Sequence, residues 1–375
     1  MPAMPIISVL HTTLSMRKVF IVKEKHVILD GLKELIAEIT APAPLALADQ
    51  NVATGDDLAP FWMEVPFVSP LRIMWDWKDF AIDATARNKN PRLAVSGLVM
   101  SWAAELSSLL ADGILTSIGF EHVWSSHYFL STLQRNDVSQ PARTFAHKAI
   151  EVDGETRHVV YAIFKGTTTI EDAVTDIKSV EDGFYEAGKN CADALATYVE
   201  SIEGATSANT VLFICGHSLG AATANVVGRL TADIADDSRR FVYTFASPNY
   251  ECAGDDQLDY QFPNFRTFTN VHDIVPMVPP NFPKIGIEHS YDHDTFDEDQ
   301  LRKFEAVYHY LRGVAFDEDD DPIGFGITKV DDEAFTRWLK NHLPSTYMSF
   351  ILSELPDDVV AFHICDTKDG EEAGE

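Results

Sequence analysis

Residues 216–220 read GHSLG, a serine set between two glycines at a spacing of two. A serine hydroxyl is a good nucleophile only when a base takes its proton and when the side chain projects from the backbone. The β-branched run TVLFIC precedes the motif, and AATANVVGRLTADIAD follows it with helical spacing, which predicts a sharp strand-to-helix turn. Gly216 and Gly220 allow that turn to pack tightly. Ser218 is therefore the predicted nucleophile, and the Leu219 N–H at the helix start is a predicted oxyanion donor.

A nucleophilic serine of this kind needs a histidine base, and the histidine needs a carboxylate that fixes its tautomer. Asp273 is the predicted acid because it lies in a turn directly after the predicted strand FRTFTNV and begins DIVP. A turn-capping role before a proline-containing loop is the alternative for this side chain. Asp255 and Asp256 follow an earlier strand and are weaker candidates.

The base is predicted from position, because several histidines follow Asp273, namely His289, His293, His309, His342 and His363. His342 lies in NHLPSTYMSFIL, between a predicted helix and one that Pro344 can start, and so on a loop at a helix edge. His342 is the preferred base. His309, in VYHYL, and His289 stay open as alternatives, and an amphipathic core-edge position is the simpler interpretation of His309.

The elements that must position these residues alternate between strands and helices. The segment PRLAVSGLVMSWAAELSSLL has helical spacing, and ARTFAHKAIEVDGETRHVVYAIFKG predicts two strands joined at the turn pair Asp153-Gly154. These are followed by a predicted helix through EAGKNCADALATYVESIEG and by two predicted strands, RRFVYTFASP and FRTFTNV. Two further predicted helices are VDDEAFTRWLK and PSTYMSFILSEL. This alternation predicts an α/β fold with a mainly parallel central sheet flanked by helices on both faces.

Four runs of the sequence resemble, in order, the successive signatures of the class 3 lipases: YAIFKGTTTIEDAVTDI, LFICGHSLGAATA, VYTFASP and NVHDIVPMVP. The class 3 lipases are the fungal-lipase-like branch of the α/β hydrolases, and the resemblance spans residues 90–352. It implies the chain order Ser, Asp, His, which Ser218, Asp273 and His342 satisfy. NHLPSTY also resembles the family's histidine, which a tyrosine and an apolar helix follow.

A second oxyanion donor is expected from the loop after an early strand, where FKGT offers the backbone N–H and hydroxyl of Thr167. The resemblance supports Thr167, and a plain loop residue is the alternative. Lys165 stands where the family usually has arginine, a departure that affects a bidentate contact rather than the donor. TTTIEDAVTDI is the counterpart of the family's lid, but its apolar stripe is short and has no aromatic residue, so interfacial activation is not expected.

The composition is strongly acidic, with 29 Lys+Arg against 58 Asp+Glu and a net charge of −29. Such a chain repels nucleic acid and anionic membrane surfaces, so a neutral lipid or small ester is the expected substrate and nucleic acid is not an expected partner. No apolar run is long enough to span a membrane, and no signal-peptide pattern opens the chain. The cysteines are widely spaced and form no CxxC: Cys191, Cys215, Cys252 and Cys365. A cytoplasmic location with reduced thiols is expected, although export without an N-terminal signal stays open.

We predict an N-terminal extension without an assigned role at 1–60, a class 3 lipase-like α/β-hydrolase domain at 61–365 and a disordered acidic tail at 366–375. The loop EHSYDHD holds possible metal ligands in His289, Asp292, His293 and Asp294. An ordinary polar loop is the favoured interpretation, so no metal site is predicted, and the chemistry needs no cofactor.

The functional hypothesis is a serine carboxylic ester hydrolase, a lipase or esterase that cleaves acylglycerols or related lipid and short-chain esters through an acyl-enzyme. The same residues also suit another acyl hydrolase or an acyltransferase, such as a phospholipase or a feruloyl esterase. A catalytically silent scaffold or binding protein is the alternative from another class, and the presence of nucleophile, acid and base argues against it.

Overall fold

The computed structural model describes residues 52–68, 71–80, 89–126, 141–166, 183–249, 262–278, 284–315, 340–355 and 360–362. The chain divides into two compact units, residues 1–45 and 46–375, and all described residues belong to the second. Most of the predicted N-terminal extension and the acidic tail therefore lie outside the described residues. The boundary at residue 60 stays a prediction. Ala53, which lies before that boundary, forms a parallel bridge with Ile150 of the main sheet.

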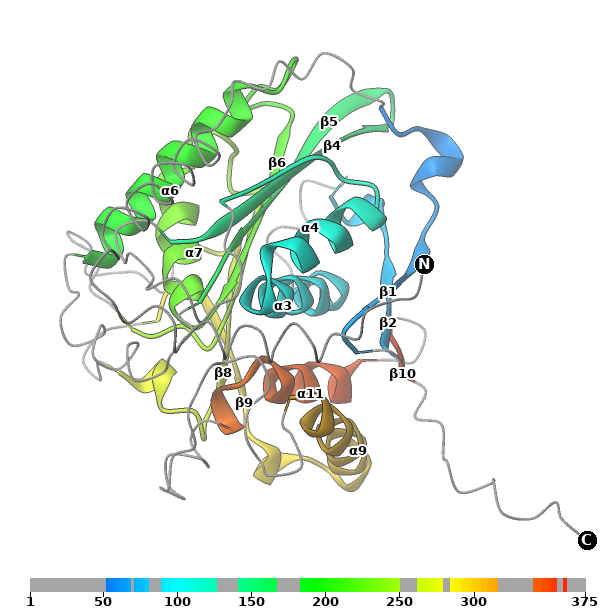
Figure 1. Cartoon of the computed structure of the whole chain (residues 1–375), viewed down its shortest axis with the longest axis vertical. Coiled ribbons are helices and arrows are strands. Elements are labelled where there is room, and N and C mark those ends of the chain that lie inside the picture. Colours follow the sequence, from blue (N-terminus) through cyan, green and yellow to red (C-terminus); the bar gives the residue numbers. More distant parts are fainter. Residues whose placement is uncertain are drawn as a thin grey trace, which may run out of the picture. The chain divides into compact units, whose positions relative to one another are not determined.

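A seven-stranded sheet forms the centre of the second unit, in the order β3-β4-β5-β6-β7-β8-β9 (Figure 1). The first three strands pair antiparallel, and β5 to β9 are all parallel. The predicted mainly parallel sheet of an α/β-hydrolase fold is thus confirmed. The strands are β3 (Glu121–Ser125), β4 (Arg143–Val152), β5 (Glu155–Phe164), β6 (Thr210–His217), β7 (Arg240–Phe245), β8 (Phe265–Asn270) and β9 (Ile287–Tyr291).

The β4–β5 hairpin turns at the predicted pair. Asp153 and Gly154 both have positive φ, 54° and 79°, as the tightest hairpin turns require at both central positions. The flanking residues Val152 and Glu155 close the antiparallel ladder. The local pair therefore determines the register in which β5 enters the sheet.

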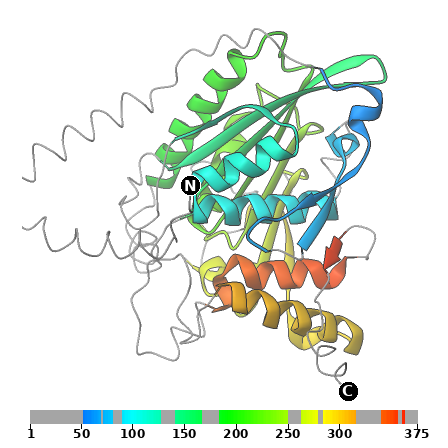
Figure 2. The ribbon, with the colours of Figure 1, turned by 45° about the vertical axis from the view of Figure 1, so that its right-hand side comes forward.

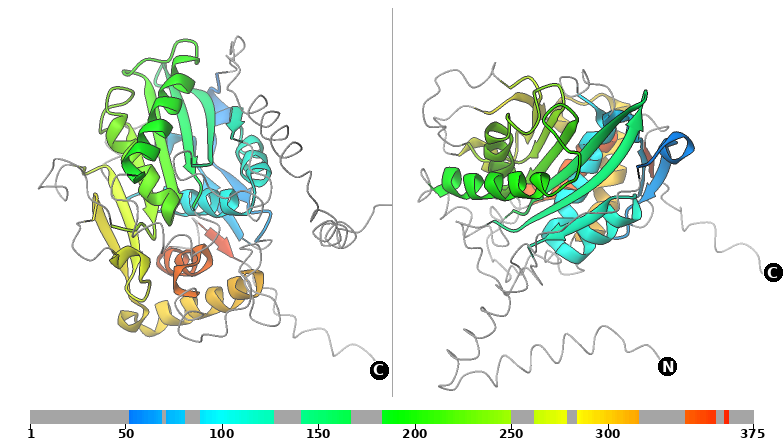
Figure 3. Two further views of the ribbon diagram at one scale, coloured as in Figure 1. Left: turned by 60° about the vertical axis from the view of Figure 1, so that its left-hand side comes forward. Right: turned by 90° about the horizontal axis from the view of Figure 1, so that it is seen from above.

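Helices cover both faces of the sheet, with α6 (Gly183–Glu200) and α7 (Leu219–Leu230) on one face and α3 (Pro91–Leu106) and α4 (Ser108–Ser117) on the other (Figure 1, Figure 3). Strand β6 shows how the two cores arise. Its side chains alternate, so Phe213 and Cys215 belong to the core beneath α3, and Leu212 and Ile214 to the core beneath α7. Because both faces of β6 are buried, its sequence is a continuous apolar run instead of an alternation of apolar and polar residues.

Helix α3 is buried along almost its whole length, from Leu93 to Glu105. Asn90 caps its N-terminus by accepting from two backbone N–H groups, and Pro91 occupies the first turn, as expected for a helix start. The prediction of one helix over PRLAVSGLVMSWAAELSSLL is wrong in one respect, because the segment forms two helices, α3 and α4, that are separated at Ser107. This residue is extended (φ −171°, ψ 148°), and its hydroxyl accepts from Leu110 N–H at 3.1 Å to cap α4.

Helix α11 (Pro344–Glu354) packs between α3 and α9 (Glu298–Ala315) (Figure 2). Pro344 starts α11 as predicted. A second sheet, in the order β1-β2-β10, is antiparallel and consists of β1 (Phe61–Glu64), β2 (Leu71–Trp75) and β10 (Val360–Phe362). Short 3-10 helices cover Gly55–Leu58, Trp77–Phe80, Val275–Met277 and His293–Thr295. In the part of the chain that the structure describes, no helix combines the length and apolar character needed to cross a membrane.

Candidate active site

Ser218 lies at the turn between β6 and α7, with φ 58° and ψ −125°. Positive φ is rare for a residue with a side chain and costs free energy. The turn is held because Ser218 N–H donates to Phe245 O, at the end of the neighbouring strand, at 2.9 Å. The backbone thus presents the hydroxyl away from the strand, as the predicted strand-to-helix turn requires.

The two glycines of the motif lie where no side chain fits. A Cβ on Gly216 would overlap the carbonyl of Gly220, and a Cβ on Gly220 would overlap the carbonyl of Phe164 at the end of β5. Helix α7 therefore approaches β5 and β6 at backbone contact distance. Leu219 is the first residue of α7, so its N–H lies among the unpaired donors of a helix start, as predicted.

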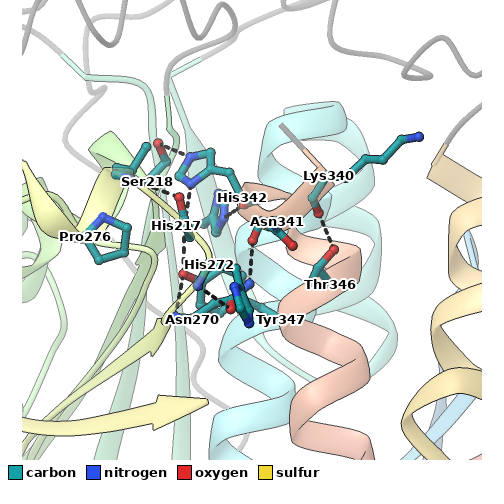
Figure 4. Close-up of polar contacts among 12 residues, drawn as sticks. His217, Ser218, Asn270, His272, Pro276, Lys340, Asn341, His342, Thr346 and Tyr347 are labelled. Atoms are coloured by element: carbon teal, nitrogen blue, oxygen red, sulfur yellow. Dashed lines mark hydrogen bonds and ion pairs between the residues drawn. The ribbon is translucent and has the colours of Figure 1, made fainter. Parts of the chain in front are cut away.

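The structure brings the three predicted triad residues together, and Figure 4 shows Ser218 beside His342. Ser218 Oγ–H donates to His342 Nε2 at 2.9 Å, and His342 Nδ1–H donates to Asp273 Oδ2 at 2.8 Å. All three residues are buried, with relative exposures of 6%, 4% and 0% in that order. The imidazole is thereby held in the tautomer whose free nitrogen faces the hydroxyl, the arrangement that general-base activation of a serine requires.

Asp273 is held by more than the histidine. Tyr347 OH donates to its Oδ2 at 2.8 Å, and Val275 N–H donates to Oδ1 at 3.0 Å. Burial and the neighbouring Asp273 charge raise the pKa of Tyr347, so this phenol stays protonated and remains a donor. Asn270 N–H donates to the same phenol oxygen at 3.1 Å. The sequence placed Tyr347 in the family pattern but assigned it no role.

The loop that carries the base is tied to the end of β8. Asn270 Nδ2–H donates to Asn341 O at 3.0 Å, and Thr346 Oγ1–H donates to Lys340 O across the start of α11. Base and acid are therefore anchored to the same strand end, although 69 residues separate them.

His217, the residue before the nucleophile, forms a second buried pair that the sequence did not predict. Its Nδ1 lies 2.7 Å from Glu105 Oε1, and its Nε2 lies 2.8 Å from the backbone oxygen of His342. Both ring nitrogens face oxygen atoms, an arrangement that favours a ring with hydrogens on both nitrogens. Burial lowers the pKa of His217, but the Glu105 charge and its hydrogen bond outweigh this and raise it.

Lys165 is a second buried basic residue that interacts with Glu105. Burial lowers its pKa to about 8, and the charge of Glu105 acts in the opposite direction. Glu105 therefore serves two cations, His217 and Lys165, from one position on α3. No local spacing rule finds such a residue, because the helix that carries it is buried on all sides.

Several predicted residues lie outside the described part of the chain. These are the second oxyanion donor Thr167, the lid counterpart TTTIEDAVTDI, the rival acids Asp255 and Asp256, and His363. The rival bases are described and do not contact Ser218. His309 is exposed on α9, and the ring of His289, on β9, stacks on Phe268 at 5.1 Å between centroids.

Residues 154–282 match the family model described as lipase (class 3). The match includes the nucleophile and the acid, and His342 lies beyond it. Among solved structures, a native lipase–propeptide complex of Rhizomucor miehei is 17% identical, with 54% of this chain and 68% of that chain covered and a TM-score of 0.37. A triacylglyceride lipase of the same organism is 19% identical, with 52% of this chain and 78% of that chain covered and a TM-score of 0.36. A nonglycosylated lipase of Yarrowia lipolytica is 20% identical, with 54% of this chain and 77% of that chain covered and a TM-score of 0.35. No curated protein matches the chain.

Proposed function

We propose that this chain, a serine ester hydrolase of the class 3 lipase type, cleaves uncharged acylglycerols or related short-chain esters through an acyl-enzyme on Ser218. The observation that carries the proposal is the continuous hydrogen-bonded chain from Ser218 Oγ through His342 to Asp273. A buried serine next to a base with a fixed tautomer is arranged for acyl transfer.

In the proposed reaction, Ser218 Oγ attacks the ester carbonyl carbon while its proton passes to His342 Nε2. The carbonyl oxygen becomes an oxyanion, stabilised by Leu219 N–H and, as the resemblance implies, by Thr167. The imidazolium then protonates the leaving alcohol as the carbon–oxygen bond breaks. Water, deprotonated by His342, attacks the acyl-enzyme and releases the acid, while the Asp273 carboxylate stabilises the imidazolium in both halves.

The net charge of −29 favours an uncharged substrate. An anionic phospholipid surface would be repelled, whereas a neutral ester is attracted or repelled little. The charge therefore favours acylglycerols and simple esters over anionic phospholipids.

The test is hydrolysis of p-nitrophenyl esters from acetate to palmitate, and of emulsified neutral acylglycerols, by wild type, Ser218→Ala and His342→Gln. We expect both substitutions to lower kcat by at least about 10⁴-fold. His309→Gln is the matched control, because that histidine is exposed on α9, and it should leave kcat unchanged. A fluorophosphonate probe should label Ser218 in wild type and no residue in Ser218→Ala.

Full activity in Ser218→Ala, or an inert wild type whose serine is not labelled, would exclude the proposal and favour a binding protein with this fold. Labelling of Ser218 without ester turnover would favour transfer of the acyl group to another acceptor. Faster cleavage of anionic phospholipid vesicles than of neutral acylglycerols would contradict the charge argument.

We also propose a cytoplasmic location. Cys191 and Cys215 are buried and unpaired, which suits a reducing compartment. Fractionation of the producing cells tests this, and recovery of the full-length chain only outside the cells would contradict it.

A further inference from the structure

We propose that His272, Asp292, His293 and Asp294 bind one divalent transition-metal ion of the zinc type. The four side chains each offer one ligand atom, and these atoms all lie within 4.8 Å of one another. The proposal does not depend on the ester hydrolase function.

The sheet brings the four residues together. Strands β8 and β9 are parallel neighbours, paired up to Asn270 and Tyr291, so the segments that follow them leave the same edge of the sheet. Val271 N–H donates to Tyr291 O at 3.0 Å and extends the pairing by one step. His272 and the 292–294 segment therefore face each other because of backbone pairing rather than side-chain attraction.

The ligand atoms are spaced somewhat more widely than the corners of a tetrahedral site. His272 Nε2 lies 3.7 Å from Asp292 Oδ1 and 3.9 Å from Asp294 Oδ2, and His293 Nε2 lies 3.4 Å from Asp294 Oδ1. With zinc–ligand bonds of about 2.0–2.1 Å, the corners of a tetrahedron are about 3.3 Å apart. The two contacts of Asp294 use its two different oxygens, and the four ligand atoms spread over as much as 4.8 Å. Side-chain rotations would therefore have to shorten the longest separation by about 1.5 Å to complete this geometry.

The donor set suits zinc or a similar ion rather than calcium or magnesium. Two imidazoles and two carboxylates form an N₂O₂ set, whereas calcium and magnesium prefer oxygen ligands alone. Two negative charges also neutralise the ion, and the acidic chain as a whole attracts cations.

The histidine rings are supported by neighbouring groups. The His293 ring stacks on Phe304, with centroids 5.8 Å apart and planes 5° apart, and lies 4.7 Å from the His272 ring. The 292–294 turn is closed because Asp294 N–H donates to Asp292 Oδ1 at 3.0 Å. Such supports orient ligands before the ion arrives and increase metal affinity.

The structure revises the sequence-based choice of ligands. The ring of His289 stacks on Phe268 away from this cluster, and His272 takes its place in the group. His272 also precedes Asp273 in the chain, so a bound ion would link the loop that carries the acid to the segment after β9.

The test uses the full chain, freed of metal by chelation, and titrates Zn²⁺ by calorimetry at physiological ionic strength with Mg²⁺ in excess. We expect one Zn²⁺ per chain, and a rise in Tm of about 5 °C when free Zn²⁺ exceeds Kd about 100-fold. His293→Gln and Asp294→Asn should each weaken Zn²⁺ binding by about tenfold or more, because even the loss of a supporting contact has an effect of that size.

His309→Gln is the matched control and should bind Zn²⁺ as wild type does, since its side chain is exposed elsewhere on α9. Equal Zn²⁺ affinity in wild type, His293→Gln and Asp294→Asn would overturn the proposal. So would complete displacement of Zn²⁺ by Mg²⁺, because it would mean that the surface carboxylates alone attract the ion. Both readouts are independent of ester turnover, so failure here is distinguishable from failure of the proposed function.

Discussion

Replacing Glu105 by glutamine removes the negative charge behind His217 while keeping the size of the side chain. In wild type, the carboxylate lies 2.7 Å from His217 Nδ1, and the side chains of this pair are only 2% and 6% exposed. The opposite ring nitrogen faces the backbone oxygen of His342 at 2.8 Å. Glu105 thus reaches the backbone of the base through the one ring of His217.

The expected loss of stability follows from the burial of the pair. Charge centres about 4 Å apart attract by about 4 kcal/mol at an effective dielectric constant of 20. Removing one partner of a buried pair typically costs 3–5 kcal/mol, because the other charge is left without compensation. Loss of Glu105 also removes one favourable charge from the surroundings of Lys165. We expect the free energy of unfolding to fall by about 3 kcal/mol.

The expected loss of activity follows from the number of hydrogens on the ring. Without the carboxylate, the charge and the hydrogen bond that raise the pKa of His217 are lost, so its pKa falls and the form with one N–H is favoured. If that N–H faces the new amide, the backbone oxygen of His342 loses its donor, at a cost of about 1–3 kcal/mol. A base that is less firmly positioned should lower kcat by about tenfold, equivalent to about 1.4 kcal/mol, with KM unchanged.

The assay combines urea unfolding with ester kinetics for wild type, Glu105→Gln, His217→Gln and the double variant. Because both residues act as one unit, the double variant should lose less stability than the sum of the single variants. Glu200→Gln, on the exposed side of α6, is the matched control and should change neither quantity. Unfolding of Glu105→Gln within about 0.5 kcal/mol of wild type, with unchanged kcat, would refute the positioning argument.

Three further outcomes are expected. Tyr347→Phe removes a donor to Asp273, so it should lower kcat severalfold and the free energy of unfolding by about 1–3 kcal/mol; wild-type values for both would show that the phenol does not support the acid. Burial, followed by electrostatic repulsion from two neighbouring histidines and Lys148, lowers the pKa of His147 from 6.5 to about 3. Its neutral form is therefore favoured by folding, and stability falls as the pH decreases from about 6.5 toward 3. Between about pH 7 and pH 5 this should cost about 2 kcal/mol, a loss that urea unfolding of His147→Gln should lack; equal pH dependence in both proteins would contradict it. Gly220→Ala should prevent folding, whereas Gly113→Ala, in open space on α4, should be neutral or stabilising by circular dichroism and thermal melts; a soluble, active Gly220→Ala enzyme would contradict the packing argument.

The parts of the site that could be predicted are local in sequence. Strand, glycine-flanked serine and helix occupy about twenty consecutive residues, so the position of Ser218 follows from a short window. Asp273 lies in the turn that follows β8. Pro344, at the start of α11, is the local signal that distinguishes His342 from the other candidate histidines.

The parts that could not be predicted depend on which elements become neighbours. Glu105 and His217 are 112 residues apart, and α3 is apolar enough all round that its one buried carboxylate breaks no pattern. His272 meets the 292–294 segment only because β9 joins the sheet beside β8. Strand β9 is short and polar, with one buried residue at its end, and therefore lacks the apolar run by which an inner strand is found.

The backbone hydrogen bonds at the strand ends bear on how the enzyme moves. Ser218 N–H donates to Phe245 O, and Ala246 N–H donates to Phe268 O, so the sheet continues through the turn that carries the nucleophile. Amide hydrogens held in this way exchange with solvent only when a large part of the fold opens. We therefore expect the amide hydrogens of Ser218 and Ala246 to exchange slowly, and the geometry of the nucleophile is present without a bound substrate. Substrate entry and product release should therefore leave this set of backbone hydrogen bonds intact.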